Sequence, residues 1–253
     1  MTTLDRTAAT TTPSTTPSTT PSTTPSTRGH GRWPLVGVAA GLGSIAATLA
    51  LDIHPTGWDI DDPYTAEVVD QLSSGKAHAS VVVGYVVVGL LLVLAAAWRR
   101  HVEPRAEQST AARVVPLGLT AAAGALSLGY GWRGALGLYG PGGQEEGAFD
   151  QAGLYVYYVL NDFGSYIGWL GVTVAAGAIA WLALKDRVLP LWIGIWSVLP
   201  VVAVLIPLVL TGLPGFPGVV SQIWMIVAFA GLAVTRDIVA ASRSGNHQEA
   251  VRA

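Results

Sequence analysis

The sequence predicts an all-α polytopic membrane protein, a bundle of six transmembrane helices with both termini in the cytoplasm and a disordered N-terminal Thr/Pro/Ser tail. Of the 253 residues, 51% are hydrophobic and only 12% are charged, whereas soluble domains carry roughly 25% charged residues. Apolar stretches long enough to cross a bilayer, about 20 residues each, recur along the chain. Lys and Arg fall almost entirely on one side of these stretches.

Residues 1–33 are predicted to form a low-complexity cytoplasmic tail. Within it, residues 10–27 read TTTPSTTPSTTPSTTPST, with a proline at every fourth position from Pro13 to Pro25. Proline breaks helices, and Thr and Ser bury too little apolar surface to offset the entropy of ordering, so we expect an extended tether. Such repeats are also typical of O-glycosylated stalks, which would lie outside the cell. Alternatively, translation could start nearer the first span. A cleaved signal peptide is disfavoured because a long polar region precedes the apolar run.

The first three spans are delimited by charge. Residues 34–51 contain no charged side chain and end at Asp52. Residues 79–98 form the most hydrophobic stretch and stop at two arginines. Residues 114–132 open after an arginine and close at Arg133. Each stretch is long enough to cross the hydrocarbon core.

The fourth span lies within an apolar stretch that is too long to cross the membrane completely. Residues 152–184 would extend roughly 50 Å as one helix, against a hydrocarbon core of about 30 Å. Trp181 and Lys185 indicate the inner end, which puts the span at 165–184. We expect residues 152–161 to lie on the outer surface as a helix, or to form a kinked extension that bends near Gly164.

The last two spans complete a transmembrane domain over residues 34–237. Residues 189–211 contain Pro200 and Pro207, which predict a kinked helix. The sixth span, 219–235, is the shortest, and a polar cytoplasmic tail follows at 238–253. All of the fourteen Lys and Arg residues except Lys76 and Arg133 fall on the side of the two termini. Because positive charge in short loops is retained in the cytoplasm, this distribution predicts a plasma-membrane protein with both termini inside.

The sequence shows no signature of catalysis, a cofactor or nucleic-acid binding. It contains no cysteine, and its five histidines do not pair at the depth that a membrane haem requires. Every ionisable side chain falls at a span end or in a loop, which argues against an ion-coupled pump. We therefore expect no cofactor, no metal and, by default, no enzymatic activity.

Polar residues at the outer ends of the spans are the candidate functional site. If those ends converge, Arg133 could pair with Asp52 or Asp162 and line an outward-facing pocket. The alternative is that helix ends are polar because they meet water. The candidate residues, together with Ser80, are Asp52, His78, Tyr130, Arg133, Asn161, Asp162 and Gln222.

Two further patterns have a structural and a functional interpretation. The acidic loop with Asp52, His54 and the aspartates at 59, 61 and 62 resembles a hard-cation site in residue type, but it lacks the regular spacing of a calcium loop and could be a solvated acidic face. Glycines four residues apart, at 37 and 41 and at 164 and 168, would allow close helix contact. That contact could lie inside the monomer or in a dimer.

The plan of six spans with a long loop after the first resembles a group of bacterial, actinobacterial-type, six-span membrane proteins that form a domain of unknown function. The residues that carry the resemblance are Leu189-Pro190-Leu191-Trp192 and Ser221-Gln222-Ile223-Trp224. The resemblance covers residues 34–237, excludes the N-terminal tail, and implies no activity or site residues.

From these observations we expect a multi-pass membrane protein with a structural, sensory or partner-binding role, its partners being the lipid bilayer and either another protein or further copies of itself. A small-molecule or lipid transporter that uses the outer polar residues is the second reading. An intramembrane enzyme is the third, and it would need a nucleophile or metal ligands that the sequence does not show.

Overall fold

A computed structural model describes residues 32–55, 65–213 and 217–252, with side chains described up to residue 235 except at 165 and 166. The predicted low-complexity tail, apart from its last two residues, and the aspartates at 59, 61 and 62 lie outside the described residues. All regular elements within the described residues are helical. The elements are α1 (Pro34–Ile45), η1 (Ala46–Ala50), η2 (Ala66–Gln71), α2 (Ser74–His101), η3 (Glu103–Arg105), α3 (Thr110–Tyr139), α4 (Gln151–Leu184), α5 (Leu191–Thr211) and α6 (Pro217–Arg252).

The predicted all-helical membrane architecture is confirmed at the level of five helices. Helices α2 to α6 are each long and apolar enough to cross a membrane. The first predicted span is shorter: α1 and η1 together run from Pro34 to Ala50, or roughly 25 Å at 1.5 Å per residue. Its final turn is π-helical, with the Leu51 amide donating to the Ala46 carbonyl over 3.0 Å.

Helices α2 and α4 begin before the predicted spans because polar side chains cap their N-termini. The Ser73 hydroxyl accepts from the Lys76 amide and starts α2, and the Asp150 carboxylate accepts from the Gly153 amide at 2.8 Å and starts α4. Residues 152–161 therefore continue α4 as one 34-residue helix through Gly164. Helix α3 continues past Arg133 to Tyr139, where the Gly140 amide donates to the Leu136 carbonyl.

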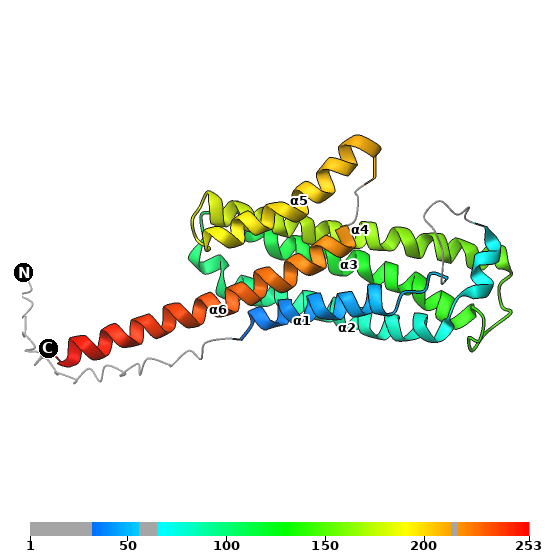
Figure 1. Ribbon diagram of the computed structural model, residues 1–253, viewed down its shortest axis with the longest axis horizontal. Helices are drawn as coiled ribbons and strands as arrows, with labels where there is room; N and C mark the ends of the chain where they lie inside the picture. Colours follow the sequence, from blue (N-terminus) through cyan, green and yellow to red (C-terminus); the bar gives the residue numbers. More distant parts are fainter. Residues whose placement is uncertain (1–31, 56–64, 214–216, 253) are drawn as a thin grey trace, which may run out of the picture.

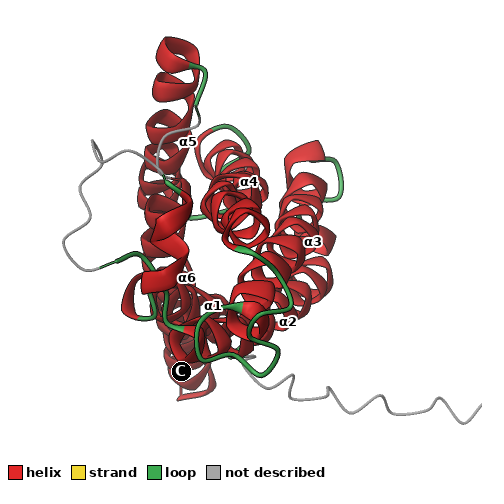
Figure 2. Ribbon diagram, turned by 90° about the vertical axis from the view of Figure 1, so that its right-hand side faces the viewer, coloured by secondary structure: helices red, strands yellow, loops and turns green. Residues whose placement is uncertain are grey.

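Consecutive helices run side by side in alternating directions, and α6 returns to pack along α1 (Figures 1 and 2). Helices α3 and α4 approach closely, because a Cβ atom on Gly171 would lie 2.4 Å from the Gly118 carbonyl oxygen. The C-terminal end of α5 projects away from the other helices (Figure 1), and Val209 and Leu210 there are 81% and 75% exposed.

Both predicted glycine pairs form helix contacts inside the monomer. Gly37 and Gly41 face Phe229 and Ile226 of α6. Gly164 and Gly168 face α3, where Gly164 meets the backbone of Gly129. Small residues thus allow backbones to approach closely, as they do in membrane helix pairs.

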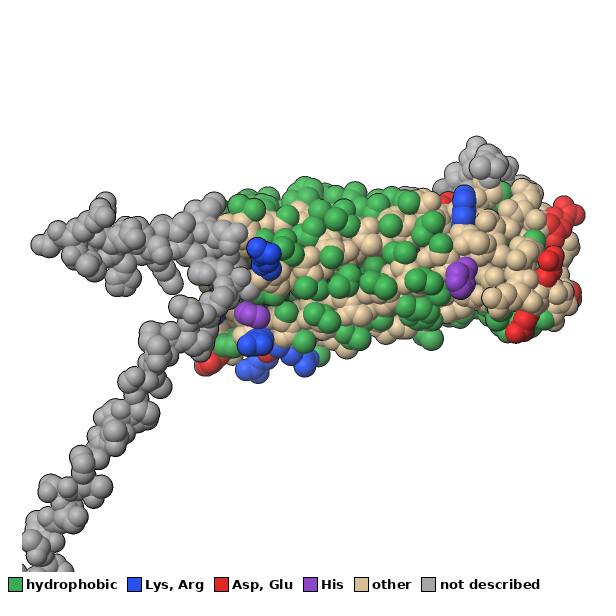
Figure 3. Space-filling view, turned by 90° about the horizontal axis from the view of Figure 1, so that it is seen from below, with side chains coloured by type: hydrophobic (Ala, Val, Ile, Leu, Met, Phe, Trp, Pro, Cys, Tyr) green, Lys and Arg blue, Asp and Glu red, His purple; other side chains and the backbone are tan. Residues whose placement is uncertain are grey.

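Charged side chains lie toward the two ends of the bundle, and hydrophobic side chains cover the middle (Figure 3). We call the end with the α2–α3 and α4–α5 connections the basic end. At this end Ser109 donates a hydrogen bond to Asp186, which joins the two connections. We call the other end, with η2 and the α3–α4 connection, the acidic end; Gln151 donates to Asp70 there over 2.5 Å.

Candidate functional site: a polar cluster near the acidic end

The cluster begins at the π-helical turn that ends the first apolar helix. The carbonyl oxygen of Ala47, in η1, accepts hydrogen bonds from the Ser80 hydroxyl at 2.7 Å and from Arg133 Nη1 at 2.8 Å. A π-helical turn departs from the regular i to i+4 pattern, and such turns are frequent at functional sites. Here the turn offers a carbonyl acceptor to two neighbouring helices.

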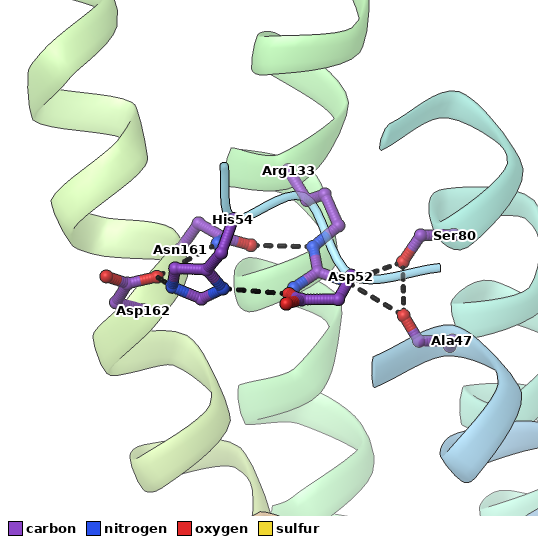
Figure 4. Close-up of polar contacts among 7 residues, drawn as sticks. All are labelled: Ala47, Asp52, His54, Ser80, Arg133, Asn161 and Asp162. Atoms are coloured by element: carbon purple, nitrogen blue, oxygen red, sulfur yellow. Dashed lines mark hydrogen bonds and ion pairs between the residues drawn. The ribbon is translucent and has the colours of Figure 1, made fainter. Parts of the chain in front are cut away.

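Arg133 is the centre of the cluster and is only 7% exposed. Its Nε donates to Asn161 Oδ1 at 2.7 Å, and its Nη1 donates to Ser80 Oγ, also at 2.7 Å, as well as to the Ala47 carbonyl. These bonds connect η1, α2, α3 and α4 (Figure 4). A buried guanidinium needs such acceptors because desolvation of an unpaired charge is costly.

His54 forms a second part of the cluster and bridges two carboxylates. Its Nδ1 lies 2.8 Å from Asp52 Oδ1, and its Nε2 lies 3.2 Å from Asp162 Oδ1. The two parts meet on α4, where Asn161 binds Arg133 and the next residue, Asp162, binds His54 (Figure 4). The segment after η1 is thereby fastened to α4.

The two carboxylates favour the charged form of the imidazole. Hydrogen bonds with Asp162 and then with Asp52 raise the pKa of His54 to about 9, against the opposing effect of burial. For Asp52, burial alone would raise the pKa, but the hydrogen bond and charge of His54 outweigh it and lower the pKa below the usual value. At neutral pH the imidazole of His54 and the carboxylate of Asp52 therefore form an oppositely charged pair.

Four of the seven predicted site residues, together with Ser80, belong to this cluster: Asp52, Arg133, Asn161 and Asp162. The expected pairing of Arg133 with Asp52 or Asp162 is not formed. Its hydrogen bonds go to neutral acceptors, and His54 takes both carboxylates instead.

The remaining predicted residues occupy different positions. Tyr130 lies one turn before Arg133, is 4% exposed, and its hydroxyl has no hydrogen-bond partner among the described residues. Gln222 is fully buried on α6 and donates to the Thr48 hydroxyl at 3.0 Å, next to Ala47 but outside the cluster. His78 is exposed on α2.

Two members were missing from the predicted site. The sequence places His54 only in the acidic loop. The Ala47 carbonyl cannot be found from side-chain chemistry, because its availability as an acceptor depends on the π-helical turn. The spacing of Asp52 and His54 was the one available signal for the histidine. Among the residues that the structure describes, no group of three or more His, Asp or Glu side chains is arranged to hold a metal ion.

Fold and site together define a helical protein with five helices suited to a membrane and a polar cluster near one end of the bundle. A comparison with protein-family models, with curated proteins and with solved structures finds no match.

Proposed function

We propose that the chain is a six-span protein of a bacterial plasma membrane, with the basic end and both termini in the cytoplasm. Arg99, Arg100 and Arg113 flank the α2–α3 connection, and Lys185 and Arg187 lie within the α4–α5 connection. The positive-inside rule favours the cytoplasm for this end. The short first helix needs only modest local thinning of the bilayer, which costs fractions of a kcal/mol per Å.

Reporter fusions test this topology. Fusions at residue 253, in the α3–α4 connection and in the α2–α3 connection should report inside, outside and inside, respectively. An N-terminal fusion should report the same side as the C-terminal one. Opposite sides for the two termini would mean an odd number of crossings and would rule out the six-span arrangement.

We further propose that the protein is a non-enzymatic structural or partner-binding membrane component. In it the polar cluster acts as an internal clasp, by which we mean a set of hydrogen bonds and ion pairs that holds the helices together. One observation supports this proposal: the charged groups are bonded to one another and to the bundle. Both ring nitrogens of His54 contact carboxylates, and Arg133 makes three hydrogen bonds within the chain. A clasp of this kind fixes the relative positions of α2, α3 and α4 at the acidic end.

The thermal stability of an Arg133→Met variant tests whether the cluster has the structural role of a clasp. If Arg133 has a structural role, Arg133→Met lowers thermal stability in detergent whether or not small molecules are present. Gln222→Met is a matched control, because Gln222 is also buried but its side chain bonds only to Thr48 among the described residues. If the Arg133 variant is as stable as the wild type, the clasp is refuted.

Transport of a small molecule or lipid is the second candidate, and the Tyr130 hydroxyl favours it. This group is buried beside Arg133 and has no partner among the described residues. An unpaired buried hydroxyl is rare and could donate to a water or a bound ligand. Its neighbour Gly84 leaves no room for a side chain, since a Cβ there would lie 2.3 Å from the Tyr130 ring.

Purification in mild detergent followed by mass spectrometry of bound molecules separates the two candidates. A transporter or binding protein should retain a small molecule that Arg133→Ala and Tyr130→Phe both lose, while the bundle stays folded. The Tyr130→Phe variant removes only the hydroxyl, so it preserves packing against Gly84. If the wild type retains no molecule that depends on these residues, the evidence for transport is removed.

A further inference from the structure

A shallow depression lies at the basic end, between the α2–α3 and α4–α5 connections. Its volume is about 390 Å³. The hydrogen bond from Ser109 to Asp186 joins the two connections beside it. The residues that line it are Gln108, Ser109, Thr110, Ala111, Trp181 and Asp186.

Exposed basic side chains lie in the two connections that form the depression and at the helix ends beside them, and they outnumber the acids there. The basic residues are Arg99, Arg100, Arg105, Arg113, Lys185 and Arg187, and the acids are Glu103, Glu107 and Asp186. Arg99 and Glu103 approach within 4.0 Å, and Arg113 donates to the Glu107 carbonyl at 3.1 Å. The surface therefore carries a net positive charge that attracts anions.

Trp181 connects this charged surface with the apolar side of the bundle. Its side chain lies on the last turn of α4, is 56% exposed, and lines the depression. Exposed tryptophan is typical of the boundary between headgroups and acyl chains. A ligand held here meets cations at one end and an apolar helix surface, including Leu184, at the other.

We infer that the basic end binds the headgroup of an anionic phospholipid from the adjacent leaflet. The headgroup phosphate lies near Arg113 and Lys185, the hydroxyl of Thr110 supplies a polar contact, and the acyl chains follow the apolar surface beside Trp181. Basic pockets at the cytoplasmic ends of membrane helices bind anionic headgroups in this way. A free phosphate ion would use the cations alone and would gain nothing from the tryptophan.

Native mass spectrometry of the full chain tests this binding. The protein is reconstituted in nanodiscs of equal parts phosphatidylglycerol and phosphatidylcholine, and the lipids that remain bound after release are counted. We expect enrichment of phosphatidylglycerol, a loss of about fivefold for each neutralised residue in Arg113→Gln and Lys185→Gln, and no change in Lys76→Gln at the acidic end.

Asp186→Asn provides the reciprocal variant. It removes the negative charge from the depression and keeps an acceptor for Ser109, so phosphatidylglycerol enrichment should rise. Equal retention of both lipids by the wild type, unchanged enrichment in the Arg113 and Lys185 variants, or a fall in the Asp186 variant overturns the inference. So does displacement of the lipid by inorganic phosphate at millimolar concentration, because a free anion would then be the preferred ligand.

Discussion

The clasp predicts that stability falls as the pH rises from about 6.5 to 9. The pKa of His54 is raised from 6.5 to about 9 in the folded protein. A raised folded-state pKa contributes stability that is fully present below the unfolded-state value of 6.5 and is lost as the pH passes through 9. The loss occurs because deprotonated His54 can no longer bridge Asp52 and Asp162 as a cation.

The size of this effect follows from the shift and from the exposure of the pair. A difference of about 2.5 pKa units corresponds to about 3.4 kcal/mol at most, since one unit is 1.36 kcal/mol. The side chains of His54 and Asp52 are 27% and 45% exposed, so solvent screening reduces the contribution to about 1–2 kcal/mol. For a chain of this length, that loss lowers the Tm by roughly 2–8 °C.

Thermal unfolding in detergent, followed by circular dichroism between pH 6 and 9.5, measures this loss. His54→Gln keeps a polar side chain of similar size and should be less stable than the wild type at pH 6, with the difference vanishing near pH 9.5. His78→Gln is the matched control, because His78 is exposed on α2 and should leave the pH profile unchanged. If the wild type shows no loss above pH 6.5, or if His54→Gln shows the same loss, the reasoning is refuted.

Three further predictions concern the clasp, the helix packing and the tail. Arg133→Met leaves Asn161 Oδ1 without the donor that it has at 2.7 Å, which should cost about 2–4 kcal/mol in a denaturant or thermal unfolding series. Gly171→Ala should destabilise by about 1–3 kcal/mol, because its Cβ meets the α3 backbone, whereas Gly124→Ala, with nothing within 4 Å, should not destabilise. Deletion of residues 2–28 should leave the thermal unfolding of the bundle unchanged and lose a co-purifying protein; an unchanged set of co-purifying proteins would argue against a partner-binding tail.

The membrane character of the chain could be predicted because it depends on local properties of the sequence. Uncharged runs such as residues 79–98 and the basic residues that follow them indicate α2 and its end directly. Helix ends were less accessible. The hydrocarbon thickness determines only the part of a helix that crosses the membrane. Helix α4 starts well before its predicted span, where the Asp150 side chain accepts from the Gly153 amide.

The site was only partly predictable, because side-chain type indicates polarity but not partners. Arg133 and Asp162 were expected to come together, and the structure brings both into one cluster (Figure 4). Their partners depend on three-dimensional details: the π-helical turn that presents the Ala47 carbonyl, and the return of the chain that brings His54 to α4. Charge pairing alone would have joined Arg133 to a carboxylate, yet both carboxylates of the cluster contact the ring of His54.

The position of Arg133 also strengthens the argument for orientation. In the sequence, Arg133 and Lys76 are the two basic residues that fall on the side opposite to the termini. The structure places Arg133 within α3, 7% exposed and bonded inside the bundle. The positive-inside rule concerns charges in loops and flanking segments, because these are the charges that resist translocation. Because Arg133 is held by the bundle, Lys76 is the one exposed Lys or Arg side chain at the acidic end within the described residues. The asymmetry in Lys and Arg that favours a cytoplasmic basic end therefore becomes larger.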